Sequence, residues 1–256
     1  MSRAIPVFEL DEVTSTNSEA MARIVAGQTP PFWVLAARQT AGRGRQGRTW
    51  QTAPGNLTAS LVIATHTDPG RAGTLSLVAG IAVAAMLRDA ASRSGVDPAR
   101  ICLKWPNDIL IDRAKAGGIL IETTRVANTA ELTAVIGIGL NLVDAPGVEG
   151  RVTSSCAALG LTITPHGAVD DLSRRMLDLL AVWEAPDFAG ANVGVEGITS
   201  LWQAYATPAG EPMSIHAGTT LACGRFAGLD RDGALLLDND TGGLQRFTFG
   251  DVTLSS

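Results

Sequence analysis

The sequence predicts an α+β protein with a large mixed domain at residues 1–208 and a small all-β domain at residues 209–256. Three observations predict this architecture. Apolar runs of strand length alternate with helical stretches through most of the chain. An alanine-rich stretch at 74–94 has the length of a long core helix. After Thr207-Pro208-Ala209-Gly210, turn residues recur every few positions. A chain of 256 residues is long enough to hold both domains.

The first predicted elements are a strand at 5–10, a helix from Thr16 to Gly27 and a strand at 32–38. Thr16 and Glu19 match a capping box, which predicts the start of the helix. The short polar side chains of Ser15-Thr16-Asn17 have two interpretations. Capping needs only one of them, so they either serve the helix alone or also hydrogen-bond a polar ligand.

A basic loop from Arg38 to Trp50 contains four arginines and three glycines. No Asp or Glu occurs between Glu19 and Asp68, so no carboxylate close in sequence neutralises these guanidinium groups. Guanidinium groups suit carboxylate and phosphate oxygens, and glycines leave backbone N–H groups open to an anion. The loop is therefore either a solvated basic turn or a mobile lid that closes on an anionic ligand.

The middle of the chain predicts strands that carry polar residues or glycines at their ends. These strands cover 57–65, 101–105, 109–111, 115–122 and 131–143, with the helix at 74–94 among them. Glycine inside a strand often marks the close approach of a ligand or another backbone. Because Lys, Asn, Asp and Gly recur at the ends of neighbouring strands, we expect one face of this sheet to line a pocket.

The last part predicts a loop at 144–167, helices at 168–184 and 195–207, and then a small antiparallel barrel. In the second helix, Ile198, Leu201, Trp202 and Tyr205 have the spacing of a core-facing stripe. The predicted barrel strands are 213–215, 221–223, 224–229, 234–237 and 245–249.

Composition narrows the function classes. An apolar fraction of 46% with 18% charged residues is typical of a globular enzyme, and a net charge of −5 argues against a general nucleic-acid binder. Three scattered cysteines and three scattered histidines show no metal or disulfide pattern. No signal region and no run of about 18 apolar residues is apparent, which favours a cytoplasmic protein without membrane attachment.

Common catalytic motifs do not fit the chain. Gly42-x-Gly44-x-x-Gly47 matches the dinucleotide-binding pattern, but the residues after it do not predict a helix, so we reject that interpretation. No P-loop and no activated serine or cysteine nucleophile is present. Only two of the twenty basic residues are lysines, Lys104 and Lys115, which makes both of interest. These features favour a protein whose ligand brings its own reactive groups.

Five motifs in this order resemble the biotin–protein ligase family. They are Ser15-Thr16-Asn17, Gly42 to Arg48, Lys104-Trp105-Pro106-Asn107-Asp108, Lys115 to Ile119 and Gly137 to Asn141. The resemblance covers nearly the whole chain. It implies a mixed-sheet catalytic domain of the biotin/lipoate ligase type, like that of class II aminoacyl-tRNA synthetases, and an SH3-like C-terminal barrel. Many bacterial members also carry an N-terminal DNA-binding domain. Here the catalytic pattern begins within the first twenty residues, so a monofunctional ligase that does not bind DNA is expected.

The resemblance also implies the reaction and the partners. The family joins biotin to ATP, with Mg²⁺, to form biotinyl-5′-AMP and pyrophosphate. It then transfers biotin to a lysine of the biotin carboxyl carrier domain of a carboxylase. A homodimer through an exposed sheet edge is a further expectation, although the sequence does not locate that edge. Both nucleophiles belong to substrates, so the protein would contribute positioning and charge stabilisation.

Residue roles follow from the matching motifs. The residues expected to bind biotin are Ser15, Thr16, Asn17, Gln39, Arg43, Gly44, Arg45, Lys115, Gly117 and Gly118. Those expected to bind ATP are Arg43, Arg45, Arg48, Trp50, Lys104, Asn107, Asp108 and Asn141, with Asp108 also the expected Mg²⁺ ligand. Lys115, Arg45 and Arg48 are expected to be catalytic. Gly117 stands where alanine is common in the family.

Two rival functions remain open. Lipoate–protein ligases and octanoyltransferases share the fold and the carrier-lysine chemistry. The basic loop and the Lys-Trp-Pro-Asn-Asp motif disfavour lipoate ligation, and the apolar surroundings of Cys102 disfavour a thiol nucleophile. The second rival is a non-catalytic anion or nucleotide binder.

Overall fold

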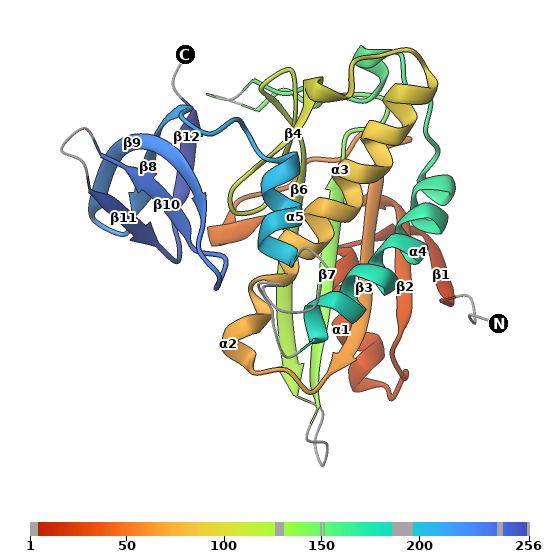
Figure 1. Ribbon diagram of the computed structural model, residues 1–256. Helices are drawn as coiled ribbons and strands as arrows, with labels where there is room; N and C mark the ends of the chain where they lie inside the picture. Colours follow the sequence, from red (N-terminus) through yellow and green to blue (C-terminus); the bar gives the residue numbers. More distant parts are fainter. Residues whose placement is uncertain are drawn as a thin grey trace.

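The computed structural model describes residues 5–125, 131–148, 150, 152–185, 197–239 and 243–254. A seven-stranded sheet with helices on both faces forms the larger part, and a five-stranded sheet forms a separate C-terminal part (Figure 1). The predicted α+β architecture is confirmed.

The large sheet is mixed, with the strand order β1-β2-β3-β7-β6-β5-β4. Its outer strand β1 runs parallel to β2, and the other neighbouring pairs are antiparallel. The strands are β1 (Val7–Val13), β2 (Phe32–Gln39), β3 (Leu57–Thr65), β4 (Ile101–Lys104), β5 (Asp108–Ile111), β6 (Ala114–Arg125) and β7 (Leu132–Leu140).

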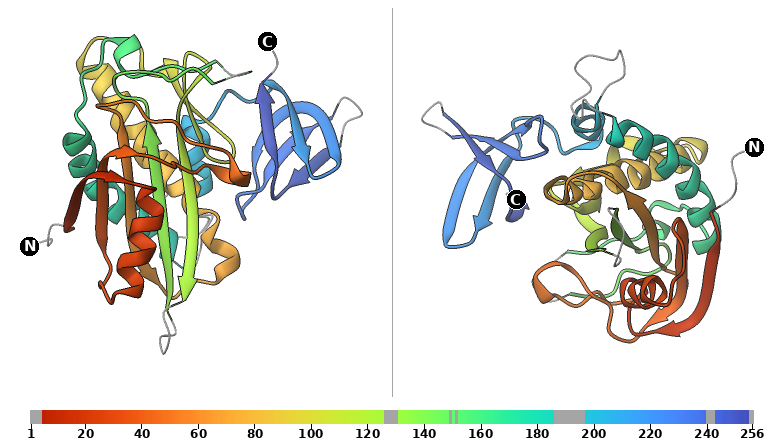
Figure 2. Two further views of the ribbon diagram at one scale, coloured as in Figure 1. Left: turned by 180° about the vertical axis from the view of Figure 1, so that it is seen from behind. Right: turned by 90° about the horizontal axis from the view of Figure 1, so that it is seen from below.

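Helices cover the two faces of this sheet unequally (Figures 1 and 2). One face carries α3 (Leu75–Arg93), α4 (Pro165–Glu184) and α5 (Ile198–Tyr205), and the other carries α1 (Thr16–Val25). Trp33, Trp183 and Trp202 are fully buried in the larger core. The face of the sheet that carries α1 has only this one short helix. Part of that face is therefore left uncovered and is open to the basic loop.

The long apolar helix differs from the expectation in one respect. A short helix, α2 (Pro69–Ala72), directly precedes α3 and lies before the start of the predicted helix at 74–94. Together they span Pro69–Arg93, and an 18-residue window within this span has a mean hydropathy of 1.6, so the helix is long and apolar enough to cross a membrane. The expectation that no segment has this composition is therefore wrong. However, 72% of that window is buried inside the protein, as in a core helix.

The C-terminal part is a curved antiparallel sheet with the strand order β11-β10-β9-β8-β12. Its strands are β8 (Pro212–Ala217), β9 (Thr220–Leu229), β10 (Leu235–Asp238), β11 (Leu244–Phe247) and β12 (Asp251–Leu254). The predicted strands 221–223 and 224–229 form one continuous strand, and β12 was missed. The predicted domain boundary after residue 208 falls between α5 and β8. Residues 195 and 196 of the predicted helix 195–207 lie outside the described residues.

Specific contacts fix the C-terminal sheet beside the β4–β5 hairpin. The indole Nε1 of Trp105 donates to the carbonyl oxygen of Gly233 at 3.0 Å. Arg113, just after the hairpin, forms an ion pair with Glu211 at 2.6 Å. The C-terminal sheet therefore lies next to the motif that begins at Lys104.

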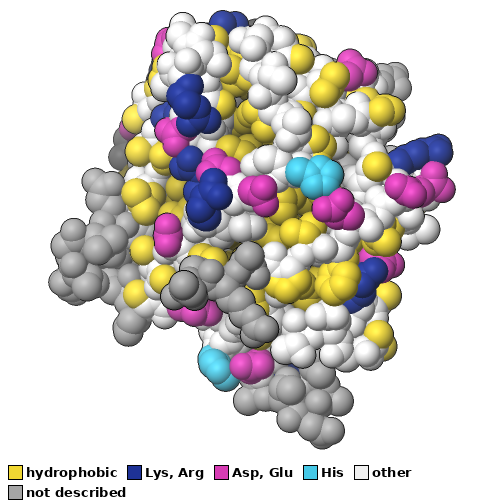
Figure 3. Space-filling model, turned by 90° about the vertical axis from the view of Figure 1, so that its right-hand side faces the viewer, with side chains coloured by type: hydrophobic (Ala, Val, Ile, Leu, Met, Phe, Trp, Pro, Cys, Tyr) yellow, Lys and Arg dark blue, Asp and Glu magenta, His cyan; other side chains and the backbone are white. Residues whose placement is uncertain are grey.

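The side of the molecule formed by β1 and α4 carries acidic, basic and apolar side chains side by side (Figure 3). His166 of α4 lies 2.8 Å from Glu9 of β1. The outer strand β1 also carries Asp11 and Glu12. Charged side chains on an edge strand disfavour pairing with another copy. The expected homodimer remains a prediction, and β1 lends it no support.

Candidate functional site

A cavity of about 790 Å³ lies on the face of the large sheet that carries α1, between the basic loop and the C-terminal sheet. Of the sixteen residues predicted for the site, fifteen line it. They are Ser15, Thr16, Asn17, Gln39, Arg43, Gly44, Arg45, Arg48, Trp50, Lys104, Asn107, Asp108, Lys115, Gly118 and Asn141. The fold therefore brings five distant sequence motifs to one place.

Uncharged polar groups gather where α1 begins. The backbone N–H and the hydroxyl of Thr16 both donate to Oε1 of Gln39, at 2.8 and 3.2 Å. The buried hydroxyl of Ser60 contacts Thr16 Oγ1 at 2.8 Å and Asn17 Oδ1 at 2.6 Å. The N-cap residue is Ser15, and its side chain makes no capping bond. The capping-box interpretation is therefore wrong, because these side chains serve a polar cluster across the sheet.

Glycines on β7 and β6 allow this close approach. A Cβ atom at Gly139 would lie 2.5 Å from the indole of Trp50, and one at Gly137 would overlap the amide of Asn17. A Cβ atom at Gly118 would meet both Trp50 and Lys115. The spaced glycines of β7 therefore serve the packing of the cavity wall, as expected for glycine inside a strand.

The basic loop is a small hairpin that folds over the cavity. The backbone N–H of Trp50 donates to the carbonyl of Gly42 at 2.9 Å, and that of Gly44 donates to the carbonyl of Arg48 at 2.7 Å. At its tip, a single turn (Arg45–Gly47) contains Gln46 with a left-handed φ of 56°. No strand-to-helix turn is present here, which confirms the rejection of a dinucleotide-binding motif.

Each arginine of the hairpin has a partner from a different element. Arg43 pairs with Glu122 of β6 at 2.7 Å. Arg45 donates to Oδ1 of Asn107 at 3.1 Å. Arg48 pairs with Asp251 of β12. Burial lowers the pKa of Arg45 from its ordinary value, although Asp251 and Asp108 oppose this shift. The hairpin is thus tied to the sheet, to the β4–β5 turn and to the C-terminal domain.

The two lysines share one carboxylate. Lys104 Nζ lies 2.9 Å from one oxygen of Asp108, and Lys115 Nζ pairs with the other. Burial alone would raise the pKa of Asp108, but Lys115 and Lys104 together hold it below its ordinary value. Lys115 also lies 5.9 Å from the centre of the Trp50 ring.

The predicted role of Asp108 as a magnesium ligand does not fit this arrangement. A hard cation needs free carboxylate oxygens, and here each oxygen accepts from an ammonium group. Within the described ranges, His, Cys, Asp and Glu form no group of three or more that could hold a metal ion. Asp108 is better described as the counter-ion of two lysines.

The cavity wall is strongly cationic. The described residues that line it include six basic and two acidic side chains, an excess of four positive charges. The whole chain has a net charge of −5. This local excess suits a ligand with carboxylate or phosphate groups. Together with the uncharged polar cluster, it can hold a molecule that is polar and neutral at one end and anionic at the other.

Two predicted residues lie differently from expectation. Gly117 does not line the cavity, because alternate strand residues face opposite sides and a Cβ atom there would meet Leu140 and Ile109. Asn141 lines it, but its amide donates to the carbonyl of Ser154 at 3.0 Å and its side chain is buried. Asn141 is therefore well placed to fix the loop at Ser154.

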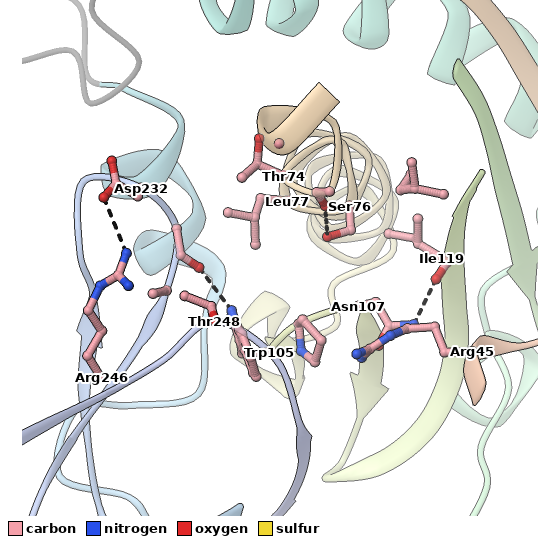
Figure 4. Close-up of a pocket in the computed structure, with 16 residues that line it drawn as sticks. Arg45, Thr74, Ser76, Leu77, Trp105, Asn107, Ile119, Asp232, Arg246 and Thr248 are labelled. Atoms are coloured by element: carbon pink, nitrogen blue, oxygen red, sulfur yellow. Dashed lines mark hydrogen bonds and ion pairs between the residues drawn. The ribbon is translucent and has the colours of Figure 1, made fainter. Parts of the chain in front are cut away.

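A smaller cleft of about 450 Å³ lies beside the turn between β4 and β5, between the start of α3 and the C-terminal sheet (Figure 4). Arg45 and Asn107 border both cavities. The opposite wall of the cleft carries Arg246, which lies 3.2 Å from Asp232 in the C-terminal domain. The guanidinium of Arg45 thus stands between the main cavity and this cleft.

Sequence reasoning missed four contributors to the site. Ser60 and Thr58 alternate within an otherwise apolar strand, and that period-two pattern could have identified them. Glu122 follows Gly118 and Leu120 at the same spacing on β6. Asp251 carried no local signal, because only the docking of the C-terminal domain brings it to the basic loop.

Comparison with known proteins identifies the family. Residues 7–141 match the biotin/lipoate A/B protein ligase family, and residues 219–255 match the biotin protein ligase C-terminal domain. The chain belongs to the biotin protein ligase family. As expected from the resemblance, it is a ligase.

Curated relatives of this ligase span nearly its whole length. It is 37% identical to the biotin–[acetyl-CoA-carboxylase] ligase of Paracoccus denitrificans, over 91% of this chain and 94% of the relative. It is also 31% identical to the bifunctional ligase/repressor BirA of Escherichia coli, over 98% of this chain and 74% of the relative.

Solved structures agree with the fold. The biotin protein ligase of Aquifex aeolicus in complex with biotin and ATP is 20% identical and superimposes with a TM-score of 0.73, covering 98% of this ligase and 99% of that chain. The Leishmania major ligase in complex with biotinyl-5-AMP is 25% identical, with a TM-score of 0.62, and covers 95% of this ligase and 99% of that chain.

Proposed function

We propose that this protein is an ATP-dependent biotin–protein ligase of the cytoplasm. It forms biotinyl-5′-AMP and pyrophosphate and then transfers biotin to a lysine of a carboxylase's biotin carboxyl carrier domain. The observation that carries the proposal is a single cavity with an uncharged polar cluster and an excess of positive charge. The match of residues 219–255 to the biotin protein ligase C-terminal domain favours biotin over lipoate.

The polar cluster is the proposed site of the biotin ring system. A ureido group has both hydrogen-bond donors and an acceptor, and Ser15, Thr16, Asn17 and Gln39 offer both kinds of partner. The backbone of Gly118 forms part of the adjoining wall. The biotin carboxylate then extends toward the basic hairpin, where Arg43, Gly44 and Arg45 lie.

The cationic groups are the proposed machinery of adenylation. The biotin carboxylate attacks the α-phosphorus of ATP, and pyrophosphate leaves. Negative charge on the phosphoryl oxygens grows in the transition state, and fixed cations lower its energy. Lys115 and Arg45 are the proposed catalytic groups, with Arg48 and Lys104 toward the phosphates. Asn107, Asp108 and Asn141 belong to the proposed ATP side, and Trp50 offers an aromatic wall for adenine.

Transfer to the carrier completes the reaction. The acceptor lysine amine attacks the acyl carbon of biotinyl-5′-AMP, an amide forms and AMP leaves. Arg45 and Lys115 stabilise the leaving phosphate in the same way as during adenylation. Magnesium would accompany the phosphates of ATP. Asp108 does not fit the role of its ligand, because each of its oxygens already pairs with an ammonium group.

The test is pyrophosphate release by the purified protein with ATP and biotin, followed by mass spectrometry of a carboxyl carrier domain. We expect pyrophosphate release that depends on biotin and a carrier mass increased by one biotinyl group. Release that depends on lipoate instead would overturn the proposal in favour of a lipoate ligase. No release with either acid would favour a non-catalytic binder.

Variants of the two proposed catalytic cations test whether the ligase activity depends on this cavity. Removing one transition-state contact of this kind costs about 2.7–4 kcal/mol, or roughly 10²–10³ in rate. Lys115→Ala and Arg45→Ala should therefore lose biotin transfer while keeping the circular dichroism spectrum. Arg93→Ala, at an exposed position in the last turn of α3, is the matched control and should keep full activity. Full activity of both site variants would refute the assigned roles.

A further inference from the structure

The lysines of this chain have an unusual distribution. Eighteen of its twenty basic residues are arginines, and the only two lysines, Lys104 and Lys115, both pair with Asp108. Lysine presents a compact ammonium group on a flexible stem, whereas the guanidinium of arginine is a wide planar fork. Two ammonium groups fit around one carboxylate in a narrow space more easily than two guanidinium groups do. The geometry of the site therefore favours lysine over arginine at positions 104 and 115.

The three side chains are held close to the cavity wall. Asp108 opens β5, opposite Gly118 of β6, and its side chain is only 11% exposed. The two lysine side chains are 18% and 21% exposed. In a region of low dielectric such a carboxylate is stable only with its partners, and removing them would leave a buried charge unpaired. The cluster carries one net positive charge, so it still attracts an anion.

The two lysines are anchored differently. Lys104 also donates to the backbone carbonyl of Val252 in the C-terminal domain, at 2.8 Å. It is therefore fixed from two directions. Lys115 faces the Trp50 ring and borders the cavity next to Gly118. A flexible ammonium group at the cavity wall, beside an aromatic face, can exchange the carboxylate for a stronger anion.

We propose that Asp108 is a positioning residue, a counter-ion that aims Lys115 into the cavity and releases it to the acyl phosphate of the substrate. Lys104 stays on Asp108 throughout and keeps the carboxylate neutralised after Lys115 has left. This inference rests on the proposed function for the identity of the anion. It replaces the expected role of Asp108 as a magnesium ligand, since a divalent cation on this carboxylate would have to displace at least one of the ammonium groups.

The chain itself supplies a direct probe, because it holds only two lysines. Protein labelled with [¹³C]lysine gives two side-chain Cε signals in a nuclear magnetic resonance spectrum, and Lys104→Arg and Lys115→Arg assign them by removing one each. Addition of biotin and ATP should shift the Lys115 signal several-fold more than the Lys104 signal. Equal shifts, or a larger shift of Lys104, would overturn the proposed exchange.

A magnesium titration of the wild-type protein tests the alternative, that Asp108 is a metal ligand. MgCl₂ alone, to about 10 mM, should shift neither lysine signal beyond the effect of NaCl at equal ionic strength. If Asp108 binds the metal, at least one ammonium group leaves it and the signal of that lysine moves. That result would overturn the proposal whether or not any variant folds, and whether or not the protein ligates biotin.

Activity measurements distinguish Asp108 as a counter-ion of the lysines from Asp108 as a magnesium ligand. Asp108→Asn places an amide NH₂ group against one of the ammonium groups and should lower the adenylation rate at least about tenfold. The Mg²⁺ concentration for half-maximal rate should stay within about twofold of wild type, because no metal ligand has been lost. Recovery of the rate at high Mg²⁺ would contradict the proposal. Asp112→Asn is the matched control, since Asp112 pairs with Arg100 at the surface and lies outside the cavity lining.

The controls distinguish failure of this inference from failure of the proposed function. Wild-type protein that releases no pyrophosphate with biotin contradicts the function. Its lysine signals still report on the magnesium question. Thermal unfolding of Asp108→Asn shows whether a lower rate reflects lost fold. If the variant does not fold, the wild-type titrations decide the proposal.

Discussion

Arg48, in the hairpin that covers the cavity, is paired with Asp251 of β12, with one nitrogen–oxygen contact at 3.2 Å. These residues are 203 positions apart in the sequence. Through this pair, the second of the five motifs, Gly42 to Arg48, touches the last strand of the C-terminal domain. Lys104 makes a second contact to the same strand, at the carbonyl of Val252. Both connections reach proposed ATP-side residues, so the position of β12 sets the position of the cations.

Asp251→Asn should uncouple the hairpin from the C-terminal domain. Both side chains of the pair are partly exposed, so we expect the free energy of unfolding to fall by less than about 1 kcal/mol. The KM for ATP in pyrophosphate release should rise several-fold, because Arg48 loses the partner that holds it. Asp89→Asn, which breaks the Arg175–Asp89 pair on the far side of the molecule, is the control. An unchanged KM in Asp251→Asn would contradict the coupling.

Glu122 joins the hairpin to the polar cluster. The same carboxylate oxygen accepts from Arg43 at 2.7 Å and from the amide of Asn17 at 2.8 Å. Glu122→Gln keeps the size of the side chain but loses the charge, so Arg43 is held less firmly. We expect a several-fold rise in the KM for biotin with a smaller effect on kcat, measured by pyrophosphate release.

The Arg38–Glu12 pair provides the control for Glu122. Its contact is 2.8 Å and both side chains are exposed at the surface. Glu12→Gln therefore makes the same chemical change without touching the cavity, and should behave as wild type. Equal effects of the two variants would show that Glu122 acts only through its contribution to the net charge of the protein.

Gly139→Ala should disturb the Trp50 wall. The added methyl carbon would lie 2.5 Å from the indole, which is closer than real contacts allow, so Trp50 and the hairpin have to move. Overpacking of this kind costs about 1–3 kcal/mol. We expect this loss in chemical denaturation together with faster proteolysis between Arg43 and Arg48. Gly147→Ala, where a methyl group meets nothing within 4 Å, is the control and should change neither measurement.

The strands and the motifs they carry could be predicted from the sequence because local patterns determine them. The apolar run 57–65 matches β3, and the Gly137-x-Gly139 spacing indicated a close approach that Trp50 and Asn17 make. The capping box at Thr16 and Glu19 failed for a physical reason. Hydrogen bonds to Gln39 and Ser60 across the sheet outcompete the local bond that a cap offers.

Long-range partners could not be predicted in the same way. No local sequence pattern near Asp251 or Glu122 predicts that an arginine of the hairpin pairs with them. Gly117 illustrates a different difficulty. Its neighbour Gly118 faces the cavity, and strand alternation alone puts Gly117 on the opposite side, but the motif gave no indication of which glycine faces inward.

The three cysteines should differ sharply in reactivity. Burial raises the pKa of Cys156 to about 12, and burial also raises the pKa of Cys102. At pH 8, a thiol with a pKa near 12 is about 10⁻⁴ thiolate, and the thiolate is the reactive form. Cys223 is exposed on β9. A chromogenic disulfide reagent should therefore modify Cys223 rapidly in the native protein and all three thiols after unfolding. Cys223→Ser should remove the rapid phase, and rapid reaction of Cys156 in that variant would show that its site opens.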